Sequence, residues 1–166
     1  VKDVHAPEVV AAVRAAEPDV GVVYGGPILR PELFSIPWLG TLGIHHGRVP
    51  HYRGKKTTFW EMYHGEPCAG ITVQRLNAGI DTGDIVRTGE VAIGRKSYSR
   101  VWREVEELGC ELFLQAVLDV GHGRAEFRPQ EMSQPRTPLF RQPAPRQLFD
   151  FWWRRLLGWP PRGAGR

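Results

Sequence analysis

Residues 43–54 read GIHHGRVPHYRG and residues 79–84 read GIDTGD, and these two segments organise the rest of the chain. The first places His45 in a turn that follows a short apolar approach, and the second places Asp81 in a glycine-rich turn. Between them lies the short apolar run GITV at residues 70–73. Because loops next to strands often carry catalytic side chains, the pattern predicts an active site in which a histidine and a carboxylate share a proton.

Upstream of the histidine turn, the sequence predicts the edge of a parallel sheet. Residues 20–24 form a continuous apolar run, typical of a central parallel strand with helices over both sheet faces. An amphipathic helix over residues 7–16 precedes this strand, and a second short strand over residues 38–44 leads into the turn. The segment 25–34 then crosses the carboxyl edge of the sheet, where open α/β folds bind their ligands.

Downstream, the pattern changes to a helix and then to a pair of strands. Thr57 or Thr58 is expected to cap a helix that Gly65 ends. Residues 69–76 alternate between apolar and polar, as a half-exposed strand does, and residues 85–93 follow the same pattern less regularly. We therefore expect an antiparallel pair joined by the loop that holds the aspartate.

The last clear element is a long amphipathic helix. Ser97 or Ser99 is expected to begin it, and Gly121 to end it. Beyond the helix the chain is rich in Pro, Arg and Gln, apart from a short amphipathic patch. The sequence therefore predicts an α/β catalytic domain over residues 1–123 and a Pro/Arg-rich tail over residues 124–166.

Composition is typical of a single soluble domain. The 166 residues suffice for one core, and the formal net charge of +4 comes from the arginine-rich tail rather than from the domain, so a nucleic-acid surface is not indicated. No window reaches the roughly 18 apolar residues of a membrane span. Cys68 and Cys110 lie among apolar neighbours without metal-ligand spacing, so we expect buried, reduced thiols and a cytoplasmic location.

Several conspicuous side chains have structural explanations. His46 and His51 are expected to be ordinary turn residues, and Trp60 and Tyr63 to lie in the core rather than form a substrate platform. The aromatic, basic stretch at residues 148–157 could lie on an anionic membrane or dock a partner. We favour a C-terminal helix that packs on its own domain or on the second subunit of a homodimer.

The spaced pattern HxGxVPxYRG at residues 45–54, followed by GIT at residues 70–72 and GIDTGD at residues 79–84, resembles the formyltransferase family that uses 10-formyltetrahydrofolate. That family includes methionyl-tRNA, glycinamide ribonucleotide and sugar-nucleotide formyltransferases. The resemblance covers about residues 6–120. It implies a Rossmann-like α/β sheet, mostly parallel with helices on both faces, in which the formyl donor and the acceptor amine meet at the strand ends.

The resemblance also implies roles for individual residues. His45 and Asp81 match the family's catalytic histidine and aspartate, and the segment 24–33 resembles the part whose backbone reads the pterin ring of the folate. The residues implied in donor binding are Tyr24, Gly25, Gly26, Ile28, Leu29, Arg30 and Asp84. Arg53 and Gly54 are candidates for binding a substrate, because arginine suits carboxylate and phosphate groups. No metal ion is implied.

Three departures separate the chain from the family pattern. Gly43 stands where the family has an asparagine, Gly47 stands where serine is common, and the family's first strands would precede Val1. The sequence therefore predicts an amino-terminally truncated domain. Since a side-chain amide near a developing oxyanion stabilises it, Gly43 also predicts slow transfer or a relative that only binds its ligand.

The chemistry follows from the two catalytic groups. An amine that attacks a formyl carbon needs a donor for the developing oxyanion and a route for its surplus proton. A carboxylate next to a histidine favours the charged imidazolium, which can donate to the oxyanion while the carboxylate accepts protons. The same pair would serve hydrolysis if water replaced the amine.

These observations predict formyl transfer to a primary amine of a small molecule, such as an amino sugar nucleotide. A methionyl-tRNA formyltransferase is less expected, because the tail is short and Pro-rich for an added tRNA-binding domain. The motifs are also compatible with a formyltetrahydrofolate hydrolase and with a catalytically weakened relative that binds its ligand.

Overall fold

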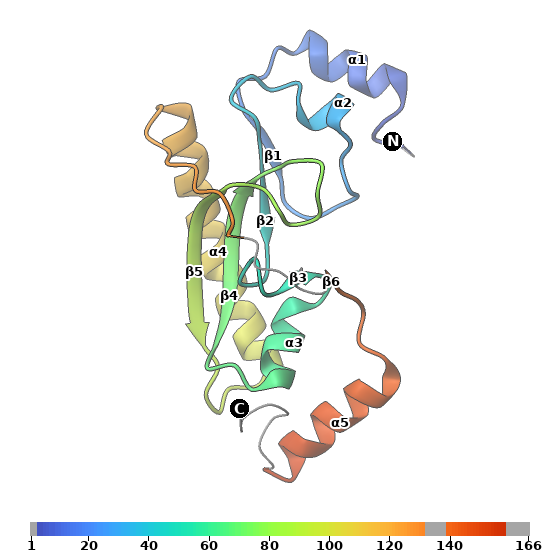
Figure 1. The fold of residues 1–166 in the computed structure, drawn as a ribbon, viewed down its shortest axis with the longest axis vertical. Helices are drawn as coiled ribbons and strands as arrows, with labels where there is room; N and C mark the ends of the chain where they lie inside the picture. Colours follow the sequence, from blue (N-terminus) through green and yellow to red (C-terminus); the bar gives the residue numbers. More distant parts are fainter. Residues whose placement is uncertain (1–2, 132–138, 159–166) are drawn as a thin grey trace.

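The computed structural model describes residues 3–131 and 139–158 and shows an α/β fold (Figure 1). Along the chain its elements are α1 (Pro7–Ala15), β1 (Gly21–Val23), α2 (Pro31–Phe34), β2 (Thr41–His45), β3 (Arg53–Gly54), α3 (Thr57–His64), β4 (Cys68–Arg75), β5 (Ile85–Ala92), α4 (Tyr98–Gly121), β6 (Leu139–Phe140) and α5 (Pro145–Leu156). Figure 1 shows α4 along one face of the sheet, α1 and α2 beside β1, and α5 at the opposite end. The α/β class expected from the sequence is confirmed.

Four strands form the main sheet in the order β1-β2-β4-β5. β1 and β2 are parallel, whereas β4 runs antiparallel to both of its neighbours, β2 and β5. The predicted antiparallel pair of β4 and β5 is therefore confirmed. Among the described strands of this sheet, parallel pairing is confined to β1 and β2, so the sheet is mixed, whereas the resemblance implies a mostly parallel one.

Strand β4 is buried on both faces, although its alternation predicted a half-exposed strand. Ile71 packs on α4, as expected for the apolar face. On the other face, the hydroxyl of Thr72 donates to the carbonyl of Gly47 (2.9 Å), and the amide of Gln74 donates to Asp81 (3.4 Å). The alternation was therefore identified correctly, but the histidine turn and the aspartate loop cover the polar face.

Most helix ends follow the predicted signals. The hydroxyl of Ser97 caps α4 by accepting a backbone N–H of the first turn (3.3 Å), and Gly65 ends α3 with a left-handed φ of 79°. The predicted cap at Thr57 or Thr58 is wrong. Lys56 is the N-cap residue of α3, with φ of 56° and no side-chain cap, and both threonines are buried within the first turn.

The aromatic side chains of α3 lie in the core. Trp60 is buried next to Phe59, and Tyr63 packs against the same cluster. The indole N–H of Trp60 donates to the carbonyl of Arg141 (2.9 Å), so the helix also anchors the tail. The expectation that Trp60 and Tyr63 are core residues is confirmed.

A buried carboxylate joins the histidine turn to α3 and β4. Glu61 is fully buried and accepts the backbone N–H groups of Arg48 (3.2 Å) and Gly70 (3.2 Å). The guanidinium of Arg48 also pairs with Glu61, Glu66 and Glu90. Burial raises the pKa of Glu61 to about 7, although these donors oppose the rise. The cluster holds the start of the turn in place.

The tail packs on the domain at several points. β6 pairs in parallel with β3, and Arg128 forms a bridge with Ile85. On α5, Phe151 is buried against Phe59 and Tyr98, with ring centroids 4.9 and 6.5 Å away. Packing of the amphipathic helix on its own domain is therefore confirmed. Its exposed apolar residues are Leu148, Phe149, Trp152, Trp153, Leu156 and Leu157. A homodimer through this face stays a prediction.

The cysteines differ from each other in burial. Cys68 is partly buried and Cys110 is exposed, and both are free thiols. The expected burial is wrong for Cys110, which lies on the side of α4 that faces Tyr24, with its sulfur 3.6 Å from the tyrosine hydroxyl. In the described part of the chain, none of the helices combines the length and apolarity needed to cross a membrane.

Strand β1 is an edge strand in the described sheet, whereas the sequence predicted a central strand. None of the described strands pairs with its outer edge, and Val22 is 57% exposed. The apolar run that predicts burial is therefore left uncovered in this structure. An unpaired apolar edge is a template for pairing with another chain.

The chain expressed alone is expected to self-associate through β1. Val22→Lys should shift it toward the monomer, because a charge on an edge strand opposes strand pairing. Thr88→Lys, at an exposed position of β5 on the other edge, is the matched control and should leave the mass distribution unchanged. Size-exclusion chromatography with light scattering measures the mass. A wild-type chain that is monomeric and unfolds cooperatively would contradict this expectation.

Candidate active site

The pairing of β2 with β4 determines the face on which His45 lies. Gly43 pairs with Gln74, and His45, the last residue of β2, pairs with Thr72. Because side chains alternate along a strand, positions 43 and 45 share one face, together with their partners on β4. This is the face that the Asp81 loop covers.

His45 and Asp81 meet as the sequence predicts. His45 Nδ1 lies 3.3 Å from Asp81 Oδ1, and the two side chains are 8% and 19% exposed. His45 Nε2 lies 2.8 Å from the carbonyl oxygen of Tyr52. Both ring nitrogens of His45 therefore face oxygen atoms that accept hydrogen bonds. The Nδ1 contact with Asp81 is longer than the roughly 2.7–2.9 Å of a charge-assisted hydrogen bond.

The residues after the histidine turn position the aspartate loop. Asp81 has a left-handed φ of 52°, a conformation in which Asp and Asn are enriched. The N–H of Gly54 donates to Asp81 Oδ2 (2.8 Å), and Arg53 Nε donates to the carbonyl of Ile80 (3.1 Å). Arg53 is buried. Arg53 and Gly54, which we expected to bind a substrate, thus hold the Asp81 loop in this structure.

Two glutamines that the sequence analysis did not single out complete the loop. Gln74 donates to Asp81 Oδ1 (3.4 Å) and accepts the N–H of Gly83 (3.2 Å). Gln130, from the tail, donates to Gln74 Oε1 (3.1 Å) and to the carbonyls of Asp81 (3.1 Å) and Gly83 (2.8 Å). The polar alternation on β4 could have identified Gln74. No local pattern identifies Gln130, because its role depends on where the tail returns.

Gln130→Ala is expected to lower the free energy of unfolding by about 1–3 kcal/mol, because the carbonyls of Asp81 and Gly83 lose the amide donor of Gln130. Gln115→Ala, at an exposed position of α4, is the control and should change it by less than about 0.5 kcal/mol. Urea denaturation measures both values. Equal stability of the two variants would mean that the tail does not support the loop.

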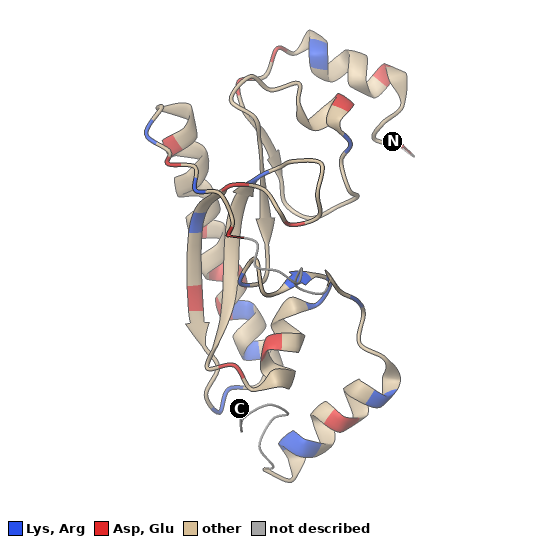
Figure 2. Cartoon of the chain, viewed as in Figure 1, with Lys and Arg blue, Asp and Glu red and all other residues tan. Residues whose placement is uncertain are grey.

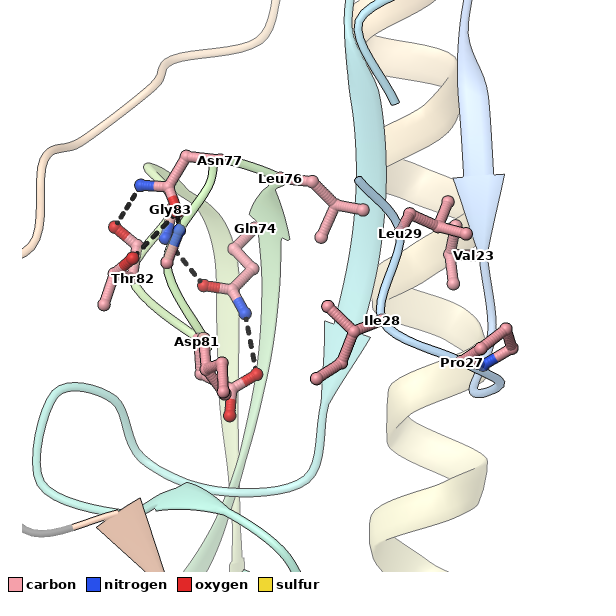
Figure 3. Close-up of a pocket in the computed structure, with 12 residues that line it drawn as sticks. Val23, Pro27, Ile28, Leu29, Gln74, Leu76, Asn77, Asp81, Thr82 and Gly83 are labelled. Atoms are coloured by element: carbon pink, nitrogen blue, oxygen red, sulfur yellow. Dashed lines mark hydrogen bonds between the residues drawn. The ribbon is translucent and has the colours of Figure 1, made fainter. Parts of the chain in front are cut away.

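A cavity of about 130 Å³ opens between the aspartate loop and the segment that follows β1. Figure 3 shows Ile28 and Leu29 on the segment after β1, and Asp81 on the loop across the cavity. Gly25 and Gly26 precede them with φ of 73° and 108°, a region that glycine adopts readily. Two of the residues implied in donor binding, Ile28 and Leu29, therefore share a cavity with Asp81.

The other residues implied in donor binding do not line this cavity: they are Tyr24, Gly25, Gly26, Arg30 and Asp84. Three of them, Tyr24, Arg30 and Asp84, use their side chains elsewhere. The hydroxyl of Tyr24 donates to Glu106 on α4, and its burial together with that bond raises the pKa of Tyr24. Arg30 pairs with a neighbouring glutamate of α2 (3.6 Å). Asp84 pairs with Arg75 (2.7 Å). These three side chains therefore make structural contacts.

Gly43 lies on β2 between two strands that contribute residues to the cavity wall. Its register partners, Val23 on β1 and Gln74 on β4, both line it. A Cβ at this position would lie 2.7 Å from Leu76 Cδ2, and Gly43 is not among the glycines with positive φ. The backbone thus does not require glycine here, and Leu76 fills the space in which an asparagine side chain would begin.

The presence of glycine at position 47 has a different structural explanation. A Cβ there would approach the Tyr52 carbonyl oxygen to 2.5 Å and His45 Nε2 to 2.7 Å. Glycine therefore allows the carbonyl of Tyr52 to reach the catalytic ring. A serine, common at this position in the family, would displace one of these groups.

His45 also lines a second cavity, of about 280 Å³, whose lining shares no residue with the first. Its walls include His46, Lys55, Lys56 and Trp102. The sequence analysis did not single out the lysines or Trp102. The signal that was available is the Lys-Lys pair directly after the YRG motif.

His46 takes part in this second cavity rather than in the catalytic pair. Its Nε2 lies 2.8 Å from Glu106 Oε1, and its ring stacks on Trp102 at a centroid distance of 4.8 Å. Burial lowers the pKa of His46, although Glu106 opposes the shift. His51 is exposed. The described residues contain no group of three or more His, Cys, Asp or Glu side chains that could hold a metal ion.

The comparison with protein families agrees with this geometry. The model of the formyl transferase family matches residues 1–117, which include the histidine turn and the aspartate loop. The chain belongs to the formyl transferase family. The resemblance stated from the sequence motifs is confirmed.

Curated relatives of this formyl transferase chain include longer enzymes. A methionyl-tRNA formyltransferase from Chloroflexus aggregans is 38% identical over 130 residues, which cover 77% of this chain and 42% of that protein. One from Geobacter metallireducens is 42% identical over 92 residues, which cover 55% of this chain and 30% of that protein. The chain therefore spans less than half the length of these two relatives.

Solved structures confirm the fold. A sugar N-formyltransferase from Shewanella matches with a TM-score of 0.70 at 19% identity, over 90% of this chain and 64% of that one. HypX from Aquifex aeolicus, in complex with tetrahydrofolic acid, matches with a TM-score of 0.68 at 23% identity, over 83% of this chain and 24% of that one. The Rossmann-like formyltransferase fold expected from the resemblance is thus confirmed.

Proposed function

We propose that the protein transfers a formyl group from 10-formyltetrahydrofolate to a primary amine. The observation that supports this most directly is the contact of His45 with Asp81 beside a cavity that Ile28 and Leu29 also line. Membership of the formyl transferase family agrees with it, and a structural neighbour, HypX, was solved with tetrahydrofolic acid.

The segment after β1 fits a planar heterocycle. Among the described residues, none forms a hydrogen bond with the backbone N–H or C=O groups of Gly25, Gly26, Ile28 or Leu29. These groups are available for the ring nitrogens and oxygens of a pterin, while the side chains of Ile28 and Leu29 provide apolar contact. The residues present therefore suit the donor that we propose.

In this proposal, Asp81 and His45 have different chemical roles. The donor supplies the formyl group. Asp81, whose carboxylate lines the cavity, accepts the proton that the attacking amine loses, directly or through a water molecule. The bond between the formyl carbon and the donor nitrogen then breaks, and this nitrogen takes up the proton, so that tetrahydrofolate leaves as the second product. His45 donates Nδ1–H to the formyl oxygen as negative charge develops there. The Tyr52 carbonyl and the Gly54 N–H keep the two side chains in place during the reaction.

For the acceptor, we propose a small amine such as an amino sugar nucleotide. The cavity of about 280 Å³ beside His45 has room for a small group. The second candidate is an aminoacylated tRNA, because the curated relatives described above are methionyl-tRNA formyltransferases. In either case the amine reaches the same catalytic pair.

The proposal is tested with the protein as its gene encodes it. 10-Formyltetrahydrofolate is supplied with an amino sugar nucleotide, with methionyl-tRNA, or without an amine, and formylated product and tetrahydrofolate are both measured. Transfer to either amine supports the proposal. Release of tetrahydrofolate at the same rate without an amine would indicate a hydrolase. Binding of tetrahydrofolate without transfer or release would indicate a ligand-binding relative.

A further inference from the structure

The buried carboxylate of Glu61, on α3, takes no part in the steps described above. The side chain is fully buried and lines neither cavity of the candidate site. It accepts the backbone N–H groups of Arg48 (3.2 Å) and Gly70 (3.2 Å), and Arg48 Nε lies 3.4 Å from Oε1. Because burying a carboxylate costs free energy even when donors surround it, the contacts that Glu61 holds are the place to look for its function.

Arg48 connects this carboxylate to Tyr52. The carbonyl of Arg48 accepts the backbone N–H of Tyr52 (2.8 Å). The guanidinium of Arg48 pairs with Glu66, which also accepts the hydroxyl of Tyr52 (2.8 Å). Figure 2 shows acidic positions on α3, just after it and on β5, the three places from which Glu61, Glu66 and Glu90 pair with Arg48. The main chain and the side chain of Tyr52 are therefore both held through Arg48.

The carbonyl of Tyr52 brings these contacts to the histidine. Its oxygen lies 2.8 Å from His45 Nε2, and Gly47 leaves the space for this approach. Because a carbonyl oxygen only accepts, the hydrogen in this contact belongs to Nε2. Nδ1 is then the ring nitrogen that faces Asp81. The position of the Tyr52 carbonyl therefore fixes the orientation of the ring and the nitrogen that it offers to the reaction.

We propose that Glu61 is a positioning residue, which holds Arg48 and thereby keeps the Tyr52 carbonyl against the ring of the catalytic histidine. The effect on rate rests on the proposed formyl transfer, whereas the orientation of the ring can be measured in the free protein. A misplacement of about 1 Å can slow a reaction by on the order of 10²-fold. Glu61 thus affects the reaction without touching either substrate.

The first test observes the His45 ring in the full-length protein without substrates. Nuclear magnetic resonance of ¹⁵N-labelled protein follows the exchange of the Nε2 hydrogen with water, and His45→Ala assigns the signal. In Glu61→Gln an amide N–H₂ replaces one acceptor oxygen, so a bond to the turn is lost. The Nε2 hydrogen should then exchange about tenfold faster, equivalent to about 1.4 kcal/mol of local opening.

Val120→Ala is the control for a general loss of stability. Val120 lies in the core cluster of Leu42, Val73, Val86 and Ala116, which contains no residue of the segment 45–54. At a melting temperature matched to that of Glu61→Gln, this variant should keep the wild-type exchange of the Nε2 hydrogen. Equal exchange in wild type and Glu61→Gln, or an equal acceleration in Val120→Ala, would overturn the inference.

The second test compares the transfer kinetics of the same proteins. Glu61→Gln should lower kcat about tenfold and change KM little, because Glu61 lines neither cavity. Val120→Ala should keep the wild-type kcat. Arg48→Lys loses the guanidinium contacts with Glu61 and Glu66 but keeps its backbone N–H, so kcat should fall by a smaller factor. This second variant also serves both tests if Glu61→Gln does not fold.

The kinetic outcomes separate the positioning role from the proposed function. A raised KM with unchanged kcat in Glu61→Gln would place Glu61 in substrate binding and overturn the inference. A wild-type kcat in both Glu61→Gln and Arg48→Lys would overturn it as well. If no amine is formylated while the exchange of the Nε2 hydrogen still depends on Glu61, the proposed function fails and the positioning of the ring remains.

Discussion

Replacing Asp81 with Asn is expected to slow formyl transfer by about 10²- to 10⁴-fold, the range that a positioned acid or base contributes. The amide cannot accept a proton, and its nitrogen would face His45 Nδ1 in place of the carboxylate oxygen. Folding should be nearly unaffected, because Asn tolerates the left-handed conformation of Asp81 and keeps an oxygen for the Gly54 N–H. Initial rates and melting temperatures measure the two effects.

Asp119→Asn is the control for removal of a carboxylate. Asp119 lies on α4 and pairs with Arg87 and Arg124, and it lines neither of the two cavities next to the catalytic pair. Its variant should keep the wild-type rate. A similar loss of rate in both variants would mean that charge in general, and not the carboxylate of Asp81, determines transfer.

His45→Ala should reduce transfer by a similar factor, and the double variant with Asp81→Asn should lose little more than either single variant. This follows because residues that act as a unit have non-additive effects. The 3.3 Å contact and the shared face of the two side chains indicate such a unit. Additive losses in the double variant would show that the histidine and the aspartate act independently.

The fold could be predicted where local patterns determine it. Ser97 begins α4, Gly65 ends α3, and the alternation on β4 identified its two faces. The environment of those faces could not be predicted, because it depends on loops that return from elsewhere in the chain. β4 is buried for this reason, and β1 is exposed because the described residues provide no strand beside it.

For the candidate site, too, local motifs predicted some residues and could not predict others. The contact of His45 with Asp81 follows from their motifs, since one motif places His45 at the end of β2 and the other places Asp81 in the loop after β4, which is the neighbouring strand. The position of the Tyr24 side chain could not be predicted, because it donates a hydrogen bond to Glu106 on α4, a helix that is distant in the sequence. Gln130 acts through three hydrogen bonds made possible only by the path of the tail. Contacts between distant segments therefore determine which motif neighbours belong to the site.

Gly43→Asn is expected to raise the rate of formyl transfer by at least about tenfold, because one side-chain donor in an oxyanion site typically contributes on the order of 10²- to 10³-fold. Position 43 shares the face of His45 and lies between two residues that line the donor cavity. The backbone at Gly43 does not have a positive φ, so an L-residue is not strained there. The measurement is the initial rate at matched melting temperature.

The obstacle to this substitution is Leu76, whose Cδ2 would lie 2.7 Å from the new Cβ. Leu76 is a partly buried side chain at the cavity wall, so it can rotate or be shortened. The double variant Gly43→Asn/Leu76→Val provides the space, and Leu76→Val alone is its control. A gain only in the double variant would show that Leu76 took the place of the amide. No gain in either variant, with unchanged melting temperatures, would mean that another group stabilises the oxyanion or that the protein does not catalyse transfer.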